Sequence, residues 1–349
     1  MIDMNKEEFK VLETQKNKFY NFSKFGKLQK VKTIGEGSFG KVILVKNIDP
    51  SNLGDSKEFV IKIGKELYIR KDQKFESQVR NKNAKKRKEL NFVELRELCI
   101  TQKIKHKNVI SLLDFKFNPK DGKLLLLMEY LQTDLGSFFK ENRENPNVMN
   151  ENFFKNISFQ ILSGLNYLHE NNIMHRDIKL ENIFYDSKNN IAKIGDFGLS
   201  RQFGFDLNEQ YTDVGTYPYK PPEVLLGLTH YSSSFDIWSA GCALVEICTG
   251  FHLFGQDNSL GVISLIYKIF GSFNEDIFPG FKKFPFSKKL ESLPKTQGIG
   301  LVNYLKKNQQ FNFANEDFYN LIEKMLCIDP TKRISAKECL VHKWFLNTN

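Results

Sequence analysis

Two short segments in the middle of the chain carry side chains that are suited to phosphoryl transfer. Residues 175–182 read His-Arg-Asp-Ile-Lys-Leu-Glu-Asn, and residues 196–198 read Asp-Phe-Gly. Moving a phosphoryl group needs a group that accepts a hydroxyl proton, cations that neutralise phosphate, and oxygen ligands for Mg²⁺. Asp177 can take the proton and Lys179 can steady the phosphate, while Asn182 and Asp196 can ligate the metal.

These segments resemble the H-R-D-x-K-x-x-N and D-F-G motifs of the eukaryotic protein kinases. A charged surface turn can match one short motif by accident, but two motifs at compatible spacing argue against accident. The resemblance implies that Asp177 is the catalytic base and that ATP and Mg²⁺ are the cofactors. It also implies protein substrates, and Lys179, two residues after the base, is typical of serine/threonine kinases.

A glycine-rich turn near the N-terminus, residues 35–40, has the pattern G-x-G-x-x-G. Dinucleotide-binding folds carry this pattern before a helix, whereas here an alternating strand at residues 28–34 precedes it and a β-rich run through Val45 follows. In kinases the same strand–turn–strand unit closes backbone amides over the ATP phosphates. The resemblance therefore implies ATP contacts from Ile34, Gly35, Glu36, Gly37, Ser38, Phe39, Gly40 and Val42.

A lysine, Lys62, interrupts an apolar strand at residues 59–63 and must have a partner if it is buried. By resemblance, Lys62 holds the α- and β-phosphates and pairs with a glutamate of a helix over residues 92–100. Glu97 is preferred over Glu94 as this partner, because it lies nine residues before His106, as in related kinases.

A fully apolar run at residues 124–128 predicts a buried strand. The residues that follow it match the hinge between the two kinase lobes, which places Glu129 and Leu131 at the adenine and Asp134 near the ribose. Met128 is then the gatekeeper of the adenine pocket, although a methionine at the end of a buried strand more often belongs to the core.

The remaining kinase motifs follow in order along the chain. Apolar residues at helical spacing predict a helix over residues 152–169, and a buried helix begins at Asp236. By resemblance, Arg333 pairs with Glu223. The predicted fold class is α+β: the two-lobed protein kinase fold, with a small β-rich N-lobe that holds one regulatory helix and a larger, mainly helical C-lobe. The expected parts are a leader at residues 1–27, the N-lobe at 28–130 with a basic insertion at 65–90, and the C-lobe at 131–346.

Three features resemble the cyclin-dependent kinases. Arg96 directly precedes Glu97, as in the cyclin-contacting helix of that family, and a segment from Leu253 to about residue 313 resembles an insert that the family shares with the MAP kinases. Sixteen residues follow Arg333, so a C-terminal extension of the MAP-kinase kind is not expected. The resemblance implies a cyclin partner and a role in the cell cycle or in transcription.

Three arginines, Arg96, Arg176 and Arg201, match positions that converge on a phosphothreonine of the activation loop in this family. A phosphate with about −1.5 to −2 charges suits such an arginine cluster. Thr212 is the candidate acceptor for an upstream activating kinase, but Tyr211 holds the expected position and remains an alternative.

The chain departs from the family near the substrate. Where the family has T-x-W-Y-R-A-P-E, residues 216–223 read T-Y-P-Y-K-P-P-E. Lys220 replaces an arginine that shapes the pocket for proline after the target residue, and lysine is not equivalent to it. Preference for Ser/Thr-Pro targets is therefore left open, and so is a kinase of another branch that is regulated without cyclin. A pseudokinase scaffold is the remaining alternative, although the lysine, the base and the metal aspartate that such proteins lose are all present.

The amino-acid composition limits the compartment and the kinds of partner that we expect for the protein. The chain has 349 residues and a net charge of +10, with Lys and Arg spread widely, which favours a basic enzyme surface over direct nucleic-acid binding. Its five cysteines contain no C-x-x-C pair, and no apolar run is long enough to span a bilayer. We therefore expect an intracellular protein of the nucleus or cytoplasm that makes no membrane contact. The run Lys85-Lys86-Arg87-Lys88 resembles a nuclear localisation signal, with a solvated loop as the alternative.

Overall fold

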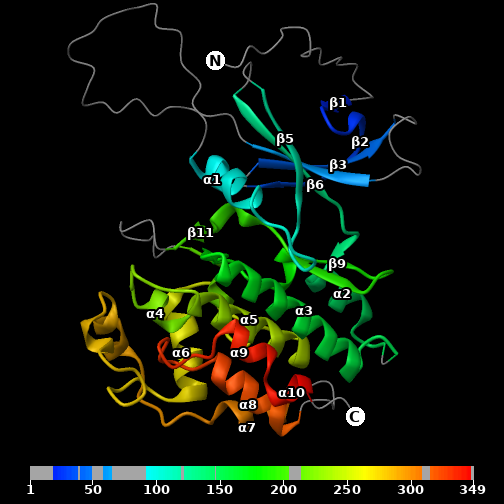
Figure 1. The fold of residues 1–349 in the computed structure, drawn as a ribbon. Helices are drawn as coiled ribbons and strands as arrows, with labels where there is room; N and C mark the ends of the chain where they lie inside the picture. The colour runs from blue at the N-terminus through cyan, green and yellow to red at the C-terminus, as the bar shows by residue number, and fades with distance from the viewer. Residues whose placement is uncertain are drawn as a thin grey trace, which may run out of the picture. The chain divides into compact units, whose positions relative to one another are not determined.

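A computed structural model describes residues 19–37, 40–48, 58–64, 92–118, 122–145, 147–203, 214–308 and 315–346. They fall into two compact units (Figure 1). The first comprises residues up to 103 and residues 111–130, and the second comprises residues 104–110 and those from 131 onward. Several predicted features lie outside the described residues, namely Ser38, Phe39, Tyr211, Thr212 and the insertion at 65–90 with its basic cluster.

The first unit is built on an antiparallel sheet whose strands run in the order β1-β2-β3-β4-β6-β5. The predicted strands are all present, and two further strands flank them at the edges of the sheet. The bounds are β1 (Phe19–Phe22), β2 (Gly26–Gly37), β3 (Gly40–Asn47), β4 (Glu58–Ile63), β5 (Leu112–Asn118) and β6 (Lys123–Glu129).

One face of this sheet forms an apolar core. Leu28, Val45, Phe59, Ile61 and Leu127 are at most 1% exposed and pack together in it. Removing one such side chain from water contributes about 1.5–3 kcal/mol. The core therefore holds together the strands that carry the glycine-rich turn and Lys62.

The sheet begins earlier than the boundary that we expected at residue 28. Strand β1 pairs with β2 from Phe19 opposite Gln29 to Phe22 opposite Gly26. Phe22 is 3% exposed and belongs to the apolar core. The last part of the expected leader is therefore an edge strand that Phe22 anchors in the core. The polar residues around Phe22 gave no sign of this strand in the sequence.

Helix α1 (Phe92–Thr101) packs beside this sheet. Glu94, Glu97, Leu98 and Thr101 recur at helical spacing and are all buried. Leu98 contacts residues of β6 in a separate apolar cluster. The buried face of α1 thus carries two carboxylates as well as apolar side chains.

The second unit is mainly helical (Figure 1). Its helices are α2 (Leu135–Asn142), α3 (Glu151–Glu170), α4 (Pro222–Leu225), α5 (Ser234–Thr249), α6 (Ser259–Phe270), α7 (Leu301–Asn308), α8 (Glu316–Met325), α9 (Ala336–Leu340) and α10 (Lys343–Leu346). Helix α3 begins where the Asn150 side chain accepts a hydrogen bond from the Phe153 backbone N–H. The apolar positions predicted for it include Phe154, Ile157 and Leu165, all of which are buried.

Helix α5 lies in the core of this unit. Each of its residues except Glu246 is buried, and Gly250 ends it in the left-handed conformation (φ 80°). A buried helix of this kind must bring partners for its polar side chains. Asp236, in its first turn, is the charged residue for which this matters most.

Short strands complete the second unit. β7 (Thr133–Asp134), β9 (Ile183–Asp186) and β10 (Ile191–Ile194) form one small sheet, and β8 (Ile173–Met174) pairs with β11 (Arg201–Gln202). Among the described helices of the chain, none is both long and apolar enough to cross a membrane.

Candidate active site

The loop after β8 gathers the predicted catalytic side chains around Asp177. Asn182 donates from Nδ2 to Asp177 Oδ2 at 2.9 Å, and Lys179 Nζ lies 3.2 Å from the same oxygen. Thr216 donates from Oγ1 to Asp177 Oδ1 at 2.8 Å, and it accepts a hydrogen bond from Lys179 Nζ at 2.9 Å. Both oxygens of the Asp177 carboxylate are therefore held in place.

Thr216 is a member of this group that the sequence did not reveal. It lies 39 residues beyond Asp177, just before the 3₁₀ turn Tyr217–Tyr219. Gly215, immediately before it, has φ 77°, and a Cβ there would lie 2.8 Å from the Arg176 carbonyl oxygen. A glycine in the left-handed conformation thus allows the chain to approach the catalytic loop.

The loop itself is anchored by Asp236 at the start of α5. This carboxylate accepts hydrogen bonds from the backbone N–H groups of His175 at 2.9 Å and Arg176 at 2.7 Å, and it lies 2.9 Å from His169 Nε2. Burial is the largest influence on its pKa and opposes ionisation. The hydrogen bond from His169, the nearby histidine charges and the Arg176 amide outweigh burial and lower the pKa of Asp236.

His175 joins this loop to the segment before Asp196. Its Nδ1 accepts a hydrogen bond from the Asp177 backbone N–H at 3.3 Å, so Nε2 carries the proton that faces the Gly195 carbonyl oxygen at 2.9 Å. One imidazole therefore links the loop that carries the base to the Asp-Phe-Gly segment.

Asn182 and Asp196 are brought together by a hairpin. Asn182 immediately precedes β9 and Asp196 follows β10, and the two strands pair from Ile183 opposite Ile194. The Gly195 N–H also donates to the Asn182 carbonyl oxygen at 2.9 Å. Asp196 has φ 62°, an uncommon conformation for a residue other than glycine.

The donor set at this end of the hairpin suits Mg²⁺. Mg²⁺ prefers carboxylate and amide oxygens and is commonly held by few protein ligands. The amide nitrogen of Asn182 is engaged by Asp177, which leaves the amide oxygen as its remaining polar atom. Asp196 supplies the carboxylate, so the two predicted ligands have the chemistry that the metal needs.

The first unit contains a buried ion pair between Lys62 on β4 and Glu97 on α1. Lys62 Nζ lies 2.7 Å and 2.9 Å from the two carboxylate oxygens, and the side chains are 10% and 5% exposed. The alternative partner, Glu94, is buried elsewhere on α1, where its carboxylate lies close to the backbone of Gly64. The sequence preference for Glu97 agrees with this arrangement.

The glycine-rich turn closes between β2 and β3, with Gly37 opposite Gly40. Gly40 has φ 120°, and a Cβ there would lie 2.2 Å from the Ile63 carbonyl oxygen, so no other residue fits without a shift of the backbone. Glu36 pairs with Lys41 on the exposed surface, and Ile34 is 47% exposed.

The predicted adenine and ribose residues belong to different units and have different surroundings. In the first unit, the Glu129 side chain accepts a hydrogen bond from the Ser111 backbone N–H at 2.7 Å. In the second, Leu131 is buried, and Asp134 caps α2 by accepting from the Ser137 N–H at 2.8 Å and the Ser137 hydroxyl at 2.7 Å. Asp134 therefore has a structural role that the sequence prediction did not include.

Two of the three predicted phosphate-binding arginines lie in the second unit. Arg176 is 3% exposed and donates to the Leu199 carbonyl oxygen at 2.7 Å and to the Tyr231 hydroxyl at 2.8 Å. Burial lowers the pKa of Arg176, and the charge of Arg201 acts in the same direction. Tyr231 is a further residue that the sequence did not reveal, and Arg96 lies on α1 in the first unit.

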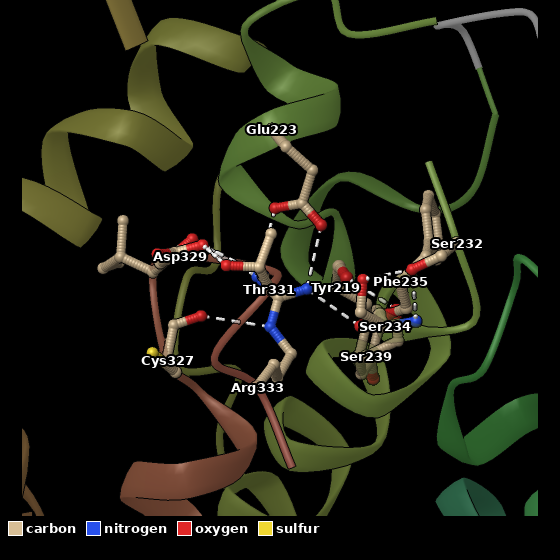
Figure 2. Close-up of polar contacts among 11 residues, drawn as sticks. Tyr219, Glu223, Ser232, Ser234, Phe235, Ser239, Cys327, Asp329, Thr331 and Arg333 are labelled. Carbon is tan, nitrogen blue, oxygen red and sulfur yellow. Dashed lines mark hydrogen bonds and ion pairs between the residues drawn. The ribbon is translucent and has the colours of Figure 1, made fainter. Parts of the chain in front are cut away.

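A buried ion pair between Arg333 and Glu223 secures α4, the helix that follows the 3₁₀ turn Tyr217–Tyr219 (Figure 2). Arg333 donates to the two carboxylate oxygens of Glu223 at 2.8 Å and 3.1 Å, and both side chains are fully buried. Arg333 also donates to the carbonyl oxygens of Ser234 at 2.8 Å and Cys327 at 3.0 Å. The partner predicted for Arg333 is thus the one that it contacts.

The protein kinase domain family matches residues 28–345 of the chain. The chain belongs to the protein kinase family. Among its relatives is cyclin-dependent kinase 1 of Encephalitozoon cuniculi, which is 34% identical over 251 residues that cover 72% of this chain and 81% of the relative. Cyclin-dependent kinase B2-1 of Oryza sativa subsp. japonica is 35% identical, with 73% and 77% covered, and probable cyclin-dependent kinase 10 of Dictyostelium discoideum is 31% identical, with 91% and 78% covered.

The protein is thus a serine/threonine protein kinase of the kind that resembles the cyclin-dependent kinases, and the predicted two-lobed fold is confirmed. As members of its family do, the kinase uses ATP and Mg²⁺. Bound Mg²⁺ would neutralise phosphate charge, and Asn182 and Asp196 are the side chains predicted to hold it.

The residues that depart from the family pattern, Tyr217 to Lys220, lie in and just after the 3₁₀ turn that follows Thr216. Lys220 is 4% exposed, and its Nζ lies 4.0 Å from the centre of the Tyr217 ring. Pro218 lies between them in the same 3₁₀ turn. The lysine that replaces the family's arginine is therefore packed against a neighbouring aromatic ring.

Proposed function

We propose that Asp177 accepts the proton of the substrate hydroxyl while Lys179 steadies the transferred phosphate. The observation that carries this proposal is the hydrogen-bonded group of Asp177, Lys179, Asn182 and Thr216. Asn182 and Asp196 hold Mg²⁺, the Lys62–Glu97 pair positions the α- and β-phosphates, and the turn at Gly35, Gly37 and Gly40 covers them. A positioned base typically contributes about 10²–10⁴-fold to the rate.

The test of this proposal is Asp177→Asn, which keeps the shape of the side chain but removes its basicity. We expect kcat to fall by about 10²–10⁴-fold with the thermal unfolding temperature nearly unchanged. Asp276→Asn is the matched control, because Asp276 is exposed. An Asp177→Asn enzyme with near wild-type kcat would assign the base to another residue.

We further propose that the kinase requires a cyclin and acts in cell-cycle control or transcription, in the nucleus or cytoplasm. The identity to relatives named cyclin-dependent kinases supports this, together with Arg96 directly before Glu97 on α1. An upstream kinase phosphorylates Thr212 or Tyr211, and the phosphate is bound by Arg96, Arg176 and Arg201. No direct nucleic-acid or membrane contact is part of this proposal.

The cyclin requirement is tested by assaying the purified kinase, phosphorylated on its activation loop, with and without the partners that co-purify with it from its own cells. We expect activity to depend on a cyclin-like partner. Full activity of the kinase alone would instead place it among kinases regulated without cyclin.

That second candidate is favoured by one observation, the packing of Lys220 on Tyr217 beside Pro218. A lysine held in this way does not reproduce the planar hydrogen-bonding geometry of arginine. Peptides that differ only as Ser-Pro and Ser-Ala separate the candidates. A strong preference for Ser-Pro supports the cyclin-dependent branch, and equal use of the two peptides supports the other branch.

A further inference from the structure

The segment of residues 282–289, here called the basic loop, lies between α6 and α7 (Figure 1). It reads Lys-Lys-Phe-Pro-Phe-Ser-Lys-Lys, and all four lysines are exposed. No acidic residue occurs from position 277 to position 290, and the nearest in the sequence are Asp276 and Glu291. The basic loop therefore carries four positive charges and has no carboxylate of its own to neutralise them.

The basic loop is folded so that its two pairs of lysines are held together. The first pair ends the 3₁₀ turn Phe281–Lys283, and the second pair lies in the 3₁₀ turn Ser287–Ser292. Ser287 is buried, and its hydroxyl donates to the Lys282 carbonyl oxygen at 2.9 Å, which closes the loop. Like charges that are held together in this way repel each other, and a bound anion relieves the repulsion.

The aromatic residues of the basic loop fix it to the end of α4. The Phe286 N–H donates to the Leu226 carbonyl oxygen at 2.9 Å. Gly227 has φ 87°, and a Cβ there would lie 2.7 Å from the Phe286 ring, so the loop packs closely against this backbone. The Phe284 ring meets the Phe278 ring edge to face, with their centres 5.0 Å apart.

This attachment connects the basic loop to the part of the chain that approaches the proposed base. Leu226 is the C-terminal cap of α4, and the buried pair of Glu223 and Arg333 secures that helix. The turn before α4 begins after Thr216, whose hydroxyl contacts Asp177. All of these residues belong to the second unit, so an anionic chain that binds the loop is held on the unit that carries the base.

The chemistry of the basic loop fits a flexible acidic polypeptide better than a nucleic acid. Its charges are all lysines, which lack the fixed two-pronged geometry with which arginine binds phosphate. Proteins that bind single-stranded nucleic acid also offer aromatic faces on which bases stack. Here Phe284 packs on Phe278, and Lys289 Nζ lies 4.3 Å from the centre of the Phe286 ring, so both rings of the loop are already engaged.

We propose that the basic loop is a docking surface for an Asp/Glu-rich segment of the protein substrate, separate from the residues around the phosphorylated serine or threonine. Each exposed lysine makes a weak ion pair with a carboxylate. Together these pairs tether the substrate to the unit that carries Asp177 and raise the local concentration of its serine or threonine there. This inference rests on the proposed function, because only a chain that is phosphorylated at this site is a substrate.

The experiment uses the active kinase with its co-purifying partners and two serine peptides that differ only in a tail. A flexible Gly/Ser linker joins the common serine sequence to a tail of about eight Asp/Glu residues or to an equally long Asn/Gln tail, and the linker is varied from about 5 to 40 residues. At the best linker length we expect KM to be about three- to tenfold lower for the acidic tail, with similar kcat. The difference should disappear in about 0.5 M KCl, because salt screens exposed charges.

Two sets of substitutions separate the basic loop from the general charge of the protein. In the loop variant Lys282, Lys283, Lys288 and Lys289 are replaced by Gln, and in the control variant the exposed lysines Lys307, Lys324, Lys337 and Lys343 of the second unit are replaced by Gln. Both variants lose four positive charges. We expect the KM difference to vanish in the loop variant and to persist in the control variant. Arginine at the same four loop positions should preserve it, because the charge is retained.

Equal KM values for the two peptides at every linker length overturn the proposal, and so does an equal loss of the difference in both variants. Thermal unfolding shows whether each variant is folded, and the arginine version reports on the loop even if the Gln version is not. Tighter binding of single-stranded DNA than of the free acidic tail, lost in the loop variant, would assign the loop to a nucleic acid instead.

Binding of the fluorescent acidic tail alone, measured by anisotropy at low ionic strength, separates this proposal from the catalytic one. The tail should bind Asp177→Asn as tightly as the wild-type kinase, since Asp177 takes no part in docking. Near wild-type kcat in Asp177→Asn would overturn the assignment of the base and leave tail binding in place. Tail binding that is unaffected in the loop variant would overturn the docking surface and leave the assignment of the base intact.

Discussion

The hydroxyl of Thr216 is the smallest group on which the proposed chemistry depends. It accepts a hydrogen bond from Lys179 and donates one to Asp177, so it holds a cation and an anion at a fixed separation. Without it, Asp177 Oδ1 and Lys179 would each lose a hydrogen-bond partner, and the base would lose part of its orientation toward the substrate hydroxyl. A misplacement of about 1 Å can cost about 10²-fold in rate.

We therefore expect Thr216→Val to lower kcat by about 10–100-fold, and Thr216→Ser to recover most of the loss because it restores the hydroxyl. Steady-state kinetics with a serine peptide measure the effect. Thr229→Val, at a half-buried threonine whose hydroxyl lies 3.1 Å from Nδ1 of the neighbouring His230, should leave kcat unchanged. Equal kcat in Thr216→Val and wild type would show that the bridge is dispensable.

Asp236 acts at the same scale but on stability. Replacing it by Asn leaves the two loop amides and His169 with a weaker acceptor in a fully buried position. We expect Asp236→Asn to lower the free energy of unfolding by about 3–5 kcal/mol, measured by urea denaturation, while Asp276→Asn changes it by less than about 0.5 kcal/mol.

The lowered pKa of Asp236 also fixes the sign of a pH effect. Because its pKa is lower in the folded state than in the unfolded state, its stabilising contribution is present above the unfolded value and is lost as the pH falls through the folded value. The wild-type free energy of unfolding should therefore fall below about pH 4. This part of the acid dependence should be missing in Asp236→Asn.

At the scale of the elements, α4 and the segment before α9 are held together by Glu223 and Arg333. Removing one partner of a buried pair leaves the other charge uncompensated, at a cost of about 3–5 kcal/mol. We expect Arg333→Ala to lower the free energy of unfolding by this amount. The neighbouring Lys332→Ala should change it by less than about 0.5 kcal/mol, because Lys332 is 64% exposed and 3.6 Å from Asp329. Similar urea midpoints for the two variants would contradict this expectation.

The helices and strands differ in whether the sequence alone predicted them. Strand β2 was predicted from alternating residues, helix α3 from apolar residues at helical spacing, and strand β6 from a fully apolar run. Strand β1 was not predicted, because its four residues are too few to show a period and its identity depends on pairing with β2.

The same distinction applies to the site. Asp177, Lys179 and Asn182 lie within six residues of each other, so their grouping was visible as a motif. Thr216 and Asp236 reach the loop only through the fold, from 39 residues beyond Asp177 and from α5. The one signal that pointed to Asp236 was a carboxylate opening an otherwise apolar helix, which must find donors when it is buried.

At the scale of the whole molecule, nucleotide binding should increase the stability of the folded protein, measured as its thermal unfolding temperature. The proposed phosphate-binding residue Lys62 and the proposed metal ligand Asp196 come from different units, and a ligand at about 100 times its Kd adds about 2.7 kcal/mol. We expect Mg²⁺ with ADP to raise the thermal unfolding temperature, and EDTA to remove most of the increase.

Lys62→Met and Asp196→Asn should each reduce this increase, whereas Lys46→Met, at an exposed lysine of β3, should retain it. An increase that survives in both Lys62→Met and Asp196→Asn would place the nucleotide on other residues.

The chain passes from the first unit to the second and back before residue 130, which affects how the protein can be divided into fragments. Residues 104–110 belong to the second unit, although both neighbouring stretches belong to the first. Within this segment Val109 is fully buried, and Asn108 donates to Gln160 Oε1 at 2.8 Å and to the Ala192 carbonyl oxygen at 3.0 Å. A fragment that stops after Tyr130 carries this segment away from its partners, exposes its apolar residues, and leaves a gap beside α3. Dividing the chain at one position therefore leaves neither unit complete. To express the units separately, residues 104–110 would have to be removed from the first fragment and added to the second.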